Sequence, residues 1–257
     1  MLFDTHVHSK YSFDSETSPE EAIKSAQIQG FGIIFTEHVD LEMPGVAPEK
    51  LVWDTRSYLR EYEPFKTERV LTGLEIGLTP ATAEQNAKIA SVMRLDFVIG
   101  SVHAAYGYDI AMPDYWRSPD FADPKAAYLE SVAEMIEACD FFDSLGHIDY
   151  PGRYCPFDDK EIRYRDYINL YNRIFDALCK NGKVMEINTK SLGHAAGADR
   201  VLGEILSGYA GRGGRYVTLG SDAHSAAEVG HCFGLARKIA KAAGLEPVYF
   251  RGRVMEK

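Results

Sequence analysis

The sequence is short of the features that mark secreted, membrane or nucleic-acid-binding proteins. Its four cysteines, Cys139, Cys155, Cys179 and Cys232, show no CxxC spacing, so we expect reduced and mostly buried thiols. No apolar run approaches the roughly 20 residues that a membrane-spanning helix needs. Met1 is followed at once by a strand-like segment, not by the basic and apolar regions of a secretory signal. These absences predict a cytoplasmic location.

Positive charge is also scarce. The chain carries 28 Lys and Arg against 38 Asp and Glu, which gives a net charge of -10. An acidic surface disfavours long nucleic acids and anionic membranes as partners. A small phosphorylated substrate stays compatible with it, because bound metal ions reverse the sign of the field inside a pocket. The oligomeric state stays open.

Length and composition indicate a single globular domain. The chain has 257 residues, of which 46% are hydrophobic and 26% charged, an ordinary globular balance. There is no internal repeat, low-complexity tract or linker-like stretch. We therefore expect one domain over residues 1–257, with disorder only in its last residues, Arg251 to Lys257.

Short apolar segments alternate with longer amphipathic ones along the chain. Strands covered by helices on both faces read as nearly continuous apolar runs. The predicted strands are Leu2–His8, Gly32–His38, Arg69–Ile76, Asp96–His103, Phe141–His147, Lys183–Asn188 and Arg215–Asp222. Helices are expected from Ser18-Pro19, from Asp123-Pro124 to about Cys139, and over Arg163–Lys180, Glu204–Ala210 and Ala226–Ala243. This alternation predicts a β/α barrel or a doubly wound sheet. Two irregular stretches, Val39–Val52 and Tyr106–Ala122, are expected to shape a substrate pocket.

Metal-binding residue types stand at the ends of six of the seven predicted strands. In parallel α/β folds the carboxyl ends of the strands meet at one edge, so these side chains should converge. The candidates are His6, His8, His38, Glu75, His103, His147, Asp222 and His224. Imidazoles with a few carboxylates suit Zn, Fe or Mn and exclude an all-oxygen Ca site. The set exceeds what one tetrahedral ion needs, which implies two or three divalent ions.

The two other histidines differ in their expected roles. His231 falls within the last predicted helix, where an ordinary surface or helix histidine is expected. His194 lies in a stretch rich in Gly and Ala, and a place near the site stays open for it.

The order of these motifs resembles the PHP (polymerase and histidinol phosphatase) family. The sequence HxH, EH, a lone Glu, SVH, GH and DxH follows that family's pattern from Asp4 to His224. The segments most similar to its histidinol-phosphatase branch are Phe97–His103, Ser144–Asp149, Glu186–Lys190 and Leu219–His224. The resemblance implies a distorted (β/α)7 TIM-like barrel with a trinuclear metal site at the C-terminal ends of the strands. It also implies hydrolysis of L-histidinol phosphate to L-histidinol and phosphate, in histidine biosynthesis.

The resemblance further implies how the ligands are shared among the metals. A hydroxide that bridges two metals would attack the phosphorus. The third ion would use Asp14, at a position where some related phosphatases carry histidine. The implied sets are His6, His8, Glu75 and Asp222 for the first metal, Glu75, His103 and His147 for the second, and Asp14, His38 and His224 for the third.

Five further residues are candidates for substrate binding and proton transfer. Arg153, Lys190 and Arg117 are expected to hold the phosphate, with Arg153 first because a planar guanidinium matches phosphate oxygens. Glu37 and Asp40 flank His38. Each could protonate the leaving group, bind the substrate amine or orient His38, and the sequence leaves these alternatives open.

Three other functions compete with the phosphatase interpretation. One is a phosphoesterase of the same family that acts on nucleotides or oligonucleotide ends, and another is a non-enzymatic metal-binding module. The third is an amidohydrolase-type barrel that cleaves C–N bonds. The lone Glu75 and the pair Asp222 and His224 fit the arrangement of metal ligands in amidohydrolase barrels poorly.

Overall fold

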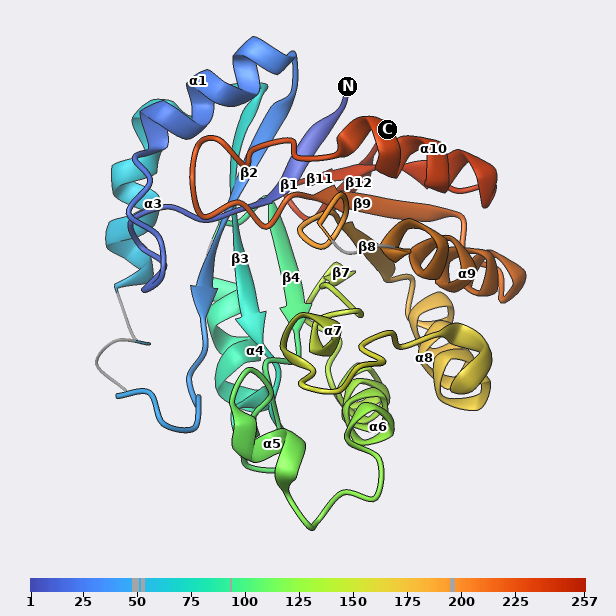
Figure 1. Cartoon of the computed structure of the whole chain (residues 1–257). Helices are drawn as coiled ribbons and strands as arrows, with labels where there is room; N and C mark the ends of the chain where they lie inside the picture. Colours follow the sequence, from blue (N-terminus) through green and yellow to red (C-terminus); the bar gives the residue numbers. More distant parts are fainter. Residues whose placement is uncertain (48–50, 52–53, 93, 195–196) are drawn as a thin grey trace.

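A curled parallel sheet forms the centre of the molecule (Figure 1). The computed structural model describes residues 1–47, 51, 54–92, 94–194 and 197–257. Each of the seven predicted strands is confirmed, and a short eighth strand pairs with the last of them at the sheet's edge. In spatial order the strands are β1 (Phe3–Val7), β2 (Gly32–Val39), β3 (Val70–Gly77), β4 (Phe97–Ser101), β7 (Ser144–Leu145), β8 (Val184–Asn188), β9 (Tyr216–Gly220) and β10 (Glu246–Pro247).

The sheet curls until its first strand meets the segment that follows β9. Val7 and Ala223 form an isolated parallel bridge. His8 N donates to Ala223 O at 2.9 Å, and Asp222 N donates to His6 O at 2.8 Å. The expected distorted TIM-like barrel is confirmed as a curled parallel sheet, in which this bridge joins β1 to the segment after β9. The contact also brings the first and last metal-binding motifs side by side.

Helices cover the outside of the sheet. Ser18 accepts a hydrogen bond from Glu21 N, and Asp123 accepts one from Lys125 N, so both predicted helix starts are confirmed. The long helices are α1 (Pro19–Gln29), α3 (Thr55–Tyr62), α4 (Ala83–Val92), α6 (Pro124–Ala138), α8 (Ile168–Lys180), α9 (Ala198–Gly211) and α10 (Phe233–Ala242). Among the described residues, none of these helices has the length and apolar character needed to cross a membrane.

Several predicted boundaries were wrong. Helix α9 begins six residues before the predicted Glu204, and α10 begins seven residues after the predicted Ala226. The predicted helix over Arg163–Lys180 is a 3-10 turn followed by α8. The expected loop over Tyr106–Ala122 contains β6 (Tyr108–Asp109) and α5 (Pro113–Arg117). Of the expected loop Val39–Val52, residues 48–50 and 52 lie outside the described residues.

The expectation of disorder at the C-terminal end was wrong. Strands β11 (Tyr249–Arg251) and β12 (Val254–Glu256) form an antiparallel hairpin. The ring of Tyr249 stacks on Phe3 at 4.1 Å between centroids, and Phe250 stacks on Phe97 at 5.3 Å. Both chain ends therefore lie at the amino-terminal end of the barrel, opposite the ends of the strand arrows in Figure 1. The hairpin covers the apolar side chains that this end of the sheet would otherwise expose.

Candidate metal centre

The predicted ligands meet in one cavity at the carboxyl ends of the strands. The cavity has a volume of about 330 Å³, and His6, His8 and Glu75 are fully buried beneath it. The described residues that line it are Phe13, Asp14, His38, Asp40, Met43, His103, His147, Tyr150, Arg153, Tyr154, Lys190, Asp222 and His224. The first expected loop contributes Asp40 and Met43, whereas none of these lining residues comes from Tyr106–Ala122.

A first cluster is formed by His6 and His8 of the β1 end, Glu75 of β3 and Asp222 after β9. The Nε2 atoms of His6 and His8 lie 3.2 and 3.4 Å from Glu75 Oε2, and 3.9 and 3.5 Å from Asp222 Oδ1. The two Nε2 atoms are 3.0 Å apart. Neighbouring vertices of a tetrahedron with bonds of about 2.05 Å are separated by roughly 3.3 Å, so these four atoms match one zinc-sized site.

A second cluster shares Glu75 with the first. Glu75 Oε1 lies 2.8 Å from His147 Nε2 and 3.3 Å from His103 Nε2, and these two nitrogens are 3.3 Å apart. Ser101 Oγ donates to the same Oε1 atom at 2.6 Å. One carboxylate thus joins both clusters through its two oxygens.

A third group lies nearer the mouth of the cavity. Asp14 Oδ2 is 3.0 Å from His224 Nε2 and 3.6 Å from His38 Nε2. His38 Nδ1 lies 3.0 Å from Glu75 Oε2, so this group adjoins the first cluster. The nitrogens of His8, His38 and His224 also lie close enough together to share an ion. The structure brings all nine predicted ligands together, and Asp14 is the most exposed of them at 37%.

Hydrogen bonds orient His6 and His8 so that their Nε2 atoms face each other. His6 Nδ1 donates to Glu186 Oε1 at 2.6 Å. Ser12 Oγ donates its proton to Glu37 Oε2 at 2.7 Å, so it accepts from His8 Nδ1 at 2.9 Å. Two neutral imidazoles held in this way would direct two lone pairs at each other across 3.0 Å. A cation, either a proton or a metal ion, is needed between them.

The pKa shifts agree with this requirement. Burial by itself lowers the pKa of His6, but Glu186, Glu75 and Asp222 outweigh it and raise that pKa well above its usual value. Burial lowers the pKa of His8 well below its usual value, and His38 and His224 add to the effect. Without metal, a proton on His6 balances the negative charge of the neighbouring carboxylates. The buried Glu75 Oε2 has no hydrogen-bond partner among the described residues, although several imidazole nitrogens surround it. This donor set fits divalent metal ions that replace those protons.

The two candidate acids lie in different surroundings. Asp40 lines the cavity, and its Oδ1 accepts from His103 Nδ1 at 2.9 Å. Burial raises its pKa, but the charges of His103 and His38 outweigh burial and lower it overall. A side chain at Gly77 would collide with this carboxylate, so glycine is needed there. Glu37 is fully buried and accepts from Ser9 and Ser12, away from the cavity.

Of the three candidate phosphate-binding cations, two line the metal cavity and one does not. Arg153 on the short helix α7 (Pro151–Tyr154) donates to Asp222 Oδ2 at 2.6 Å and to Asn188 Oδ1 at 2.8 Å. Lys190 Nζ donates to Asp222 O at 2.7 Å and lies 3.0 Å from His224 Nδ1. Both line the cavity. Arg117 is exposed on α5 and is not among the described residues that line it.

Sequence reasoning missed the residues that hold the ligands in place. Glu186 binds His6 Nδ1 and also accepts from His147 N at 2.7 Å. An acid within the apolar strand Val184–Asn188 was the signal that could have identified it. Ser12 and Ser101 gave no comparable signal. His231 precedes α10, so its predicted place within a helix was wrong; it donates to Leu192 O and stacks on His194.

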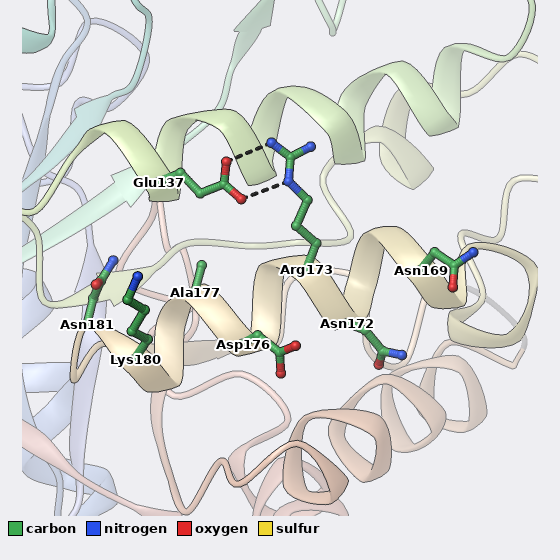
Figure 2. A pocket seen from close by; sticks show the side chains of 8 residues that line it. All are labelled: Glu137, Asn169, Asn172, Arg173, Asp176, Ala177, Lys180 and Asn181. Carbon is green, nitrogen blue, oxygen red and sulfur yellow. Dashed lines mark hydrogen bonds and ion pairs between the residues drawn. The ribbon is translucent and has the colours of Figure 1, made fainter.

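A larger depression lies elsewhere on the molecule, along α8 and the end of α6, and has a volume of about 600 Å³ (Figure 2). Its most prominent contact is the paired hydrogen bond of Arg173 with Glu137, at 2.7 and 2.8 Å. The described residues that line it include neither histidine nor cysteine. Among the described residues, the groups of side chains that could hold a metal ion all belong to the site at the smaller cavity.

Comparisons with known proteins show the family to which the chain belongs. The model of the PHP domain family matches residues 4–190. The chain is 34% identical to a probable histidinol-phosphatase of Clostridium acetobutylicum, over 100% of this chain and 99% of that protein. It is 28% identical to the histidinol-phosphatase of Lactococcus lactis, over 99% and 96% of the two chains.

Solved structures give the same result. The crystal structure of histidinol phosphate phosphatase from Lactococcus lactis, complexed with Zn, L-histidinol and phosphate, superposes with a TM-score of 0.90. It is 27% identical and covers 100% of this chain and 99% of that one. A second structure, from Listeria monocytogenes, shares the fold with a TM-score of 0.71 at 15% identity, over 90% and 98% of the two chains.

Proposed function

Because the chain belongs to the PHP domain family, we propose that it is a phosphatase that hydrolyses L-histidinol phosphate to L-histidinol and phosphate. The observation that carries the proposal is the convergence of two clusters on the two oxygens of Glu75, beside Arg153 and Lys190. Full-length similarity to histidinol-phosphatases supports the choice of substrate. These relatives are phosphomonoesterases, which argues against cleavage of C–N bonds.

The chain would hold three divalent ions. When bound, they would supply an activated water and positive charge for the phosphate. We propose zinc, because the donors are imidazoles and carboxylates and the similar Lactococcus structure contains zinc. The ligand sets are His6, His8, Glu75 and Asp222; Glu75, His103 and His147; and Asp14, His38 and His224.

Arg153 and Lys190 would bind the phosphate. Arg153 is fixed by Asp222 and Asn188, and its buried Nε has no hydrogen-bond partner among the described residues. An ordered guanidinium with a free donor suits a phosphate oxygen. Lys190 has a third ammonium donor beyond its contacts with Asp222 and His224. Both cations stand at the same wall of the cavity, so they would orient the ester against the metal ligands.

We assign positioning roles to Asp40 and Glu37. An ionised Asp40 that accepts from His103 fixes that imidazole with Nε2 toward Glu75. Its lowered pKa makes Asp40 a poor donor of a proton to the leaving group. Glu37 fixes His8 through Ser12 and lies outside the cavity lining.

The test combines metal analysis with assays of phosphate release. We expect at least two metal ions per chain after zinc loading, and release of phosphate from L-histidinol phosphate. Nucleoside monophosphates and an amide panel scored for ammonia release serve as comparisons. Fewer than two ions per chain together with no phosphate release would overturn the proposal.

A further inference from the structure

The strand β8 (Val184–Asn188) supplies none of the nine candidate metal ligands, although it lies between two strands that each lead into one. Two of its polar side chains are nevertheless buried, since Glu186 is 1% exposed and Asn188 is 4% exposed. Because they are two positions apart on a strand, both lie on the same face of the sheet. We propose that they form one positioning unit, in which Glu186 orients the metal-binding histidines and Asn188 orients Arg153. This inference rests on the proposed function and gives two further residues a part in it.

Glu186 accepts hydrogen bonds from three donors. Its Oε1 atom accepts from His6 Nδ1 at 2.6 Å, and its Oε2 atom accepts from His147 N at 2.7 Å and from Asn188 Nδ2 at 3.2 Å. His6 belongs to the first cluster and His147 to the second, so one carboxylate holds ligands of both. Only a carboxylate accepts on both of its sides, because an amide would turn an NH2 group toward one of these donors.

The neighbouring strand leaves room for the contact between Glu186 and His6. Gly220 of β9 pairs with Asn188 in the register of the two strands. A Cβ atom at Gly220 would collide with Glu186 Oε1 and with His6 Cβ. Glycine is therefore needed at this point of β9 for the carboxylate to reach the imidazole.

The amide of Asn188 uses all four of its hydrogen-bonding positions. Its Nδ2 atom donates to Glu186 Oε2 at 3.2 Å and to Asp222 Oδ2 at 3.4 Å. Its Oδ1 atom accepts from Arg153 Nη2 at 2.8 Å and from Lys190 N at 3.0 Å. If the amide were turned over, its oxygen would face two carboxylates and its NH2 group two donors, so the surroundings select one orientation. Asn188 thus joins the carboxylate that orients His6 to the guanidinium that is to bind phosphate.

Arg153 needs this amide to direct its guanidinium. The residue stands on the four-residue helix α7. The ring of Tyr150, whose centroid lies 5.5 Å from Arg153 Cζ, offers the guanidinium an aromatic face but no acceptor atom for a particular nitrogen. The hydrogen bond to Asp222 fixes Nη1, and the one to Asn188 fixes Nη2. The two bonds together set the direction of Nε, the buried donor without a hydrogen-bond partner among the described residues.

Two variants should affect zinc and inorganic phosphate in opposite ways. In Glu186→Gln an NH2 group faces a donor, so we expect zinc affinity to fall about 10- to 100-fold and phosphate binding to recover once zinc saturates the site. Asn188→Leu keeps the volume and removes the amide. In this variant the zinc affinity should stay at the wild-type level, and the Kd for inorganic phosphate should rise at least about ten-fold.

Calorimetric titrations of the zinc-free protein with zinc, and of the zinc-loaded protein with phosphate, measure both affinities. Glu68→Gln and Asn169→Leu are the matched controls at exposed residues and should leave both affinities unchanged. The same loss pattern in Glu186→Gln and Asn188→Leu, the reverse pattern, or no loss in either variant would overturn the inference.

A double variant tests whether Asn188 acts through Arg153. Arg153→Met removes the guanidinium, so the addition of Asn188→Leu should weaken phosphate binding by no more than about two-fold beyond it. A further ten-fold loss would overturn the assigned role of Asn188. Asn188→Ala, which leaves space for water, takes the place of Asn188→Leu if that variant does not fold, and the same outcomes apply to it. Wild-type protein that binds zinc and phosphate but does not hydrolyse L-histidinol phosphate would overturn the proposed function and not these positioning roles.

Discussion

The Nε2 atoms of His6 and His8 lie 3.0 Å apart and face the same carboxylate, Glu75. Glu186 and Ser12 hold the opposite edges of the two rings. The donors are thus oriented by the fold itself, and what the cluster requires is positive charge at its centre. The behaviour of the protein with and without metal follows from this competition between protons and metal ions.

Metal binding should release protons and strengthen as the pH rises. Burial alone lowers the pKa of His103, but Asp40 and Glu75 outweigh it and raise that pKa to about 10 in the metal-free site. The imidazole is therefore protonated below that pH, and a metal ion must displace the proton. Calorimetric zinc titrations between about pH 6.5 and pH 8.5, in two buffers of different ionisation enthalpy, should show tighter binding at the higher pH. Binding without proton release would contradict this prediction.

Removal of the shared carboxylate charge should disable both clusters. In Glu75→Gln the amide keeps the size of the side chain but loses the charge that faces His6 and His147. We expect kcat to fall about 1000-fold or more, with at least one ion lost per chain. Steady-state kinetics and elemental analysis of the same preparation check this. Glu68→Gln, at an exposed residue, should leave both values at the wild-type level.

The hydroxyl of Ser12 should matter although it lies outside the metal clusters. It accepts from His8 Nδ1 and from His38 N, and donates to Glu37. Without it the ring of His8 loses its fixed orientation, so Ser12→Ala should weaken metal affinity about 10- to 100-fold. Activity should recover as zinc is added, which a general loss of folding would not allow. Ser91→Ala, at an exposed helix position, is the control.

The parts of the molecule that the sequence predicted are those encoded locally. Each strand reads as an apolar run with its metal-binding residue at its end, and closure of the barrel then brings His6 near Asp222. The supporting contacts are not local: Glu186 meets His6 across 180 positions of the chain. The helix α9 begins after Gly197, which has a left-handed φ of 84°. The sequence around this glycine is rich in Gly and Ala and shows no helical pattern, so it does not predict where the helix begins. Such features depend on tertiary packing, which periodicity does not reveal.

Arg153 should act as more than a positive charge. Its guanidinium makes two hydrogen bonds, to Asp222 and Asn188, at 2.6 and 2.8 Å, through two different nitrogens of one planar fork, and the single nitrogen of a lysine does not reproduce this geometry. In Arg153→Lys we expect kcat/KM to fall about 100-fold and inhibition by inorganic phosphate to weaken in parallel. Arg165→Lys, at a side chain that is 59% exposed, is the matched control. Unchanged phosphate inhibition in Arg153→Lys would rule out its contact with the phosphate.

The C-terminal hairpin should stabilise the barrel without contributing to the reaction. Phe250 is 5% exposed and stacks on Phe97, a fully buried residue of β4, at the end of the barrel opposite the metal cavity. Phe250→Ala leaves a void there and should lower the free energy of unfolding by about 3–5 kcal/mol. Val254→Ala, at a side chain 65% exposed on the same hairpin, should change it by less than about 0.5 kcal/mol. Denaturant unfolding of the metal-loaded proteins measures both values. At a temperature where Phe250→Ala is still folded, its kcat should equal that of the wild type, because the contacts of the hairpin with the described residues include none of the candidate metal ligands. A proportionate loss of kcat in the folded variant would show instead that the two ends of the barrel are coupled.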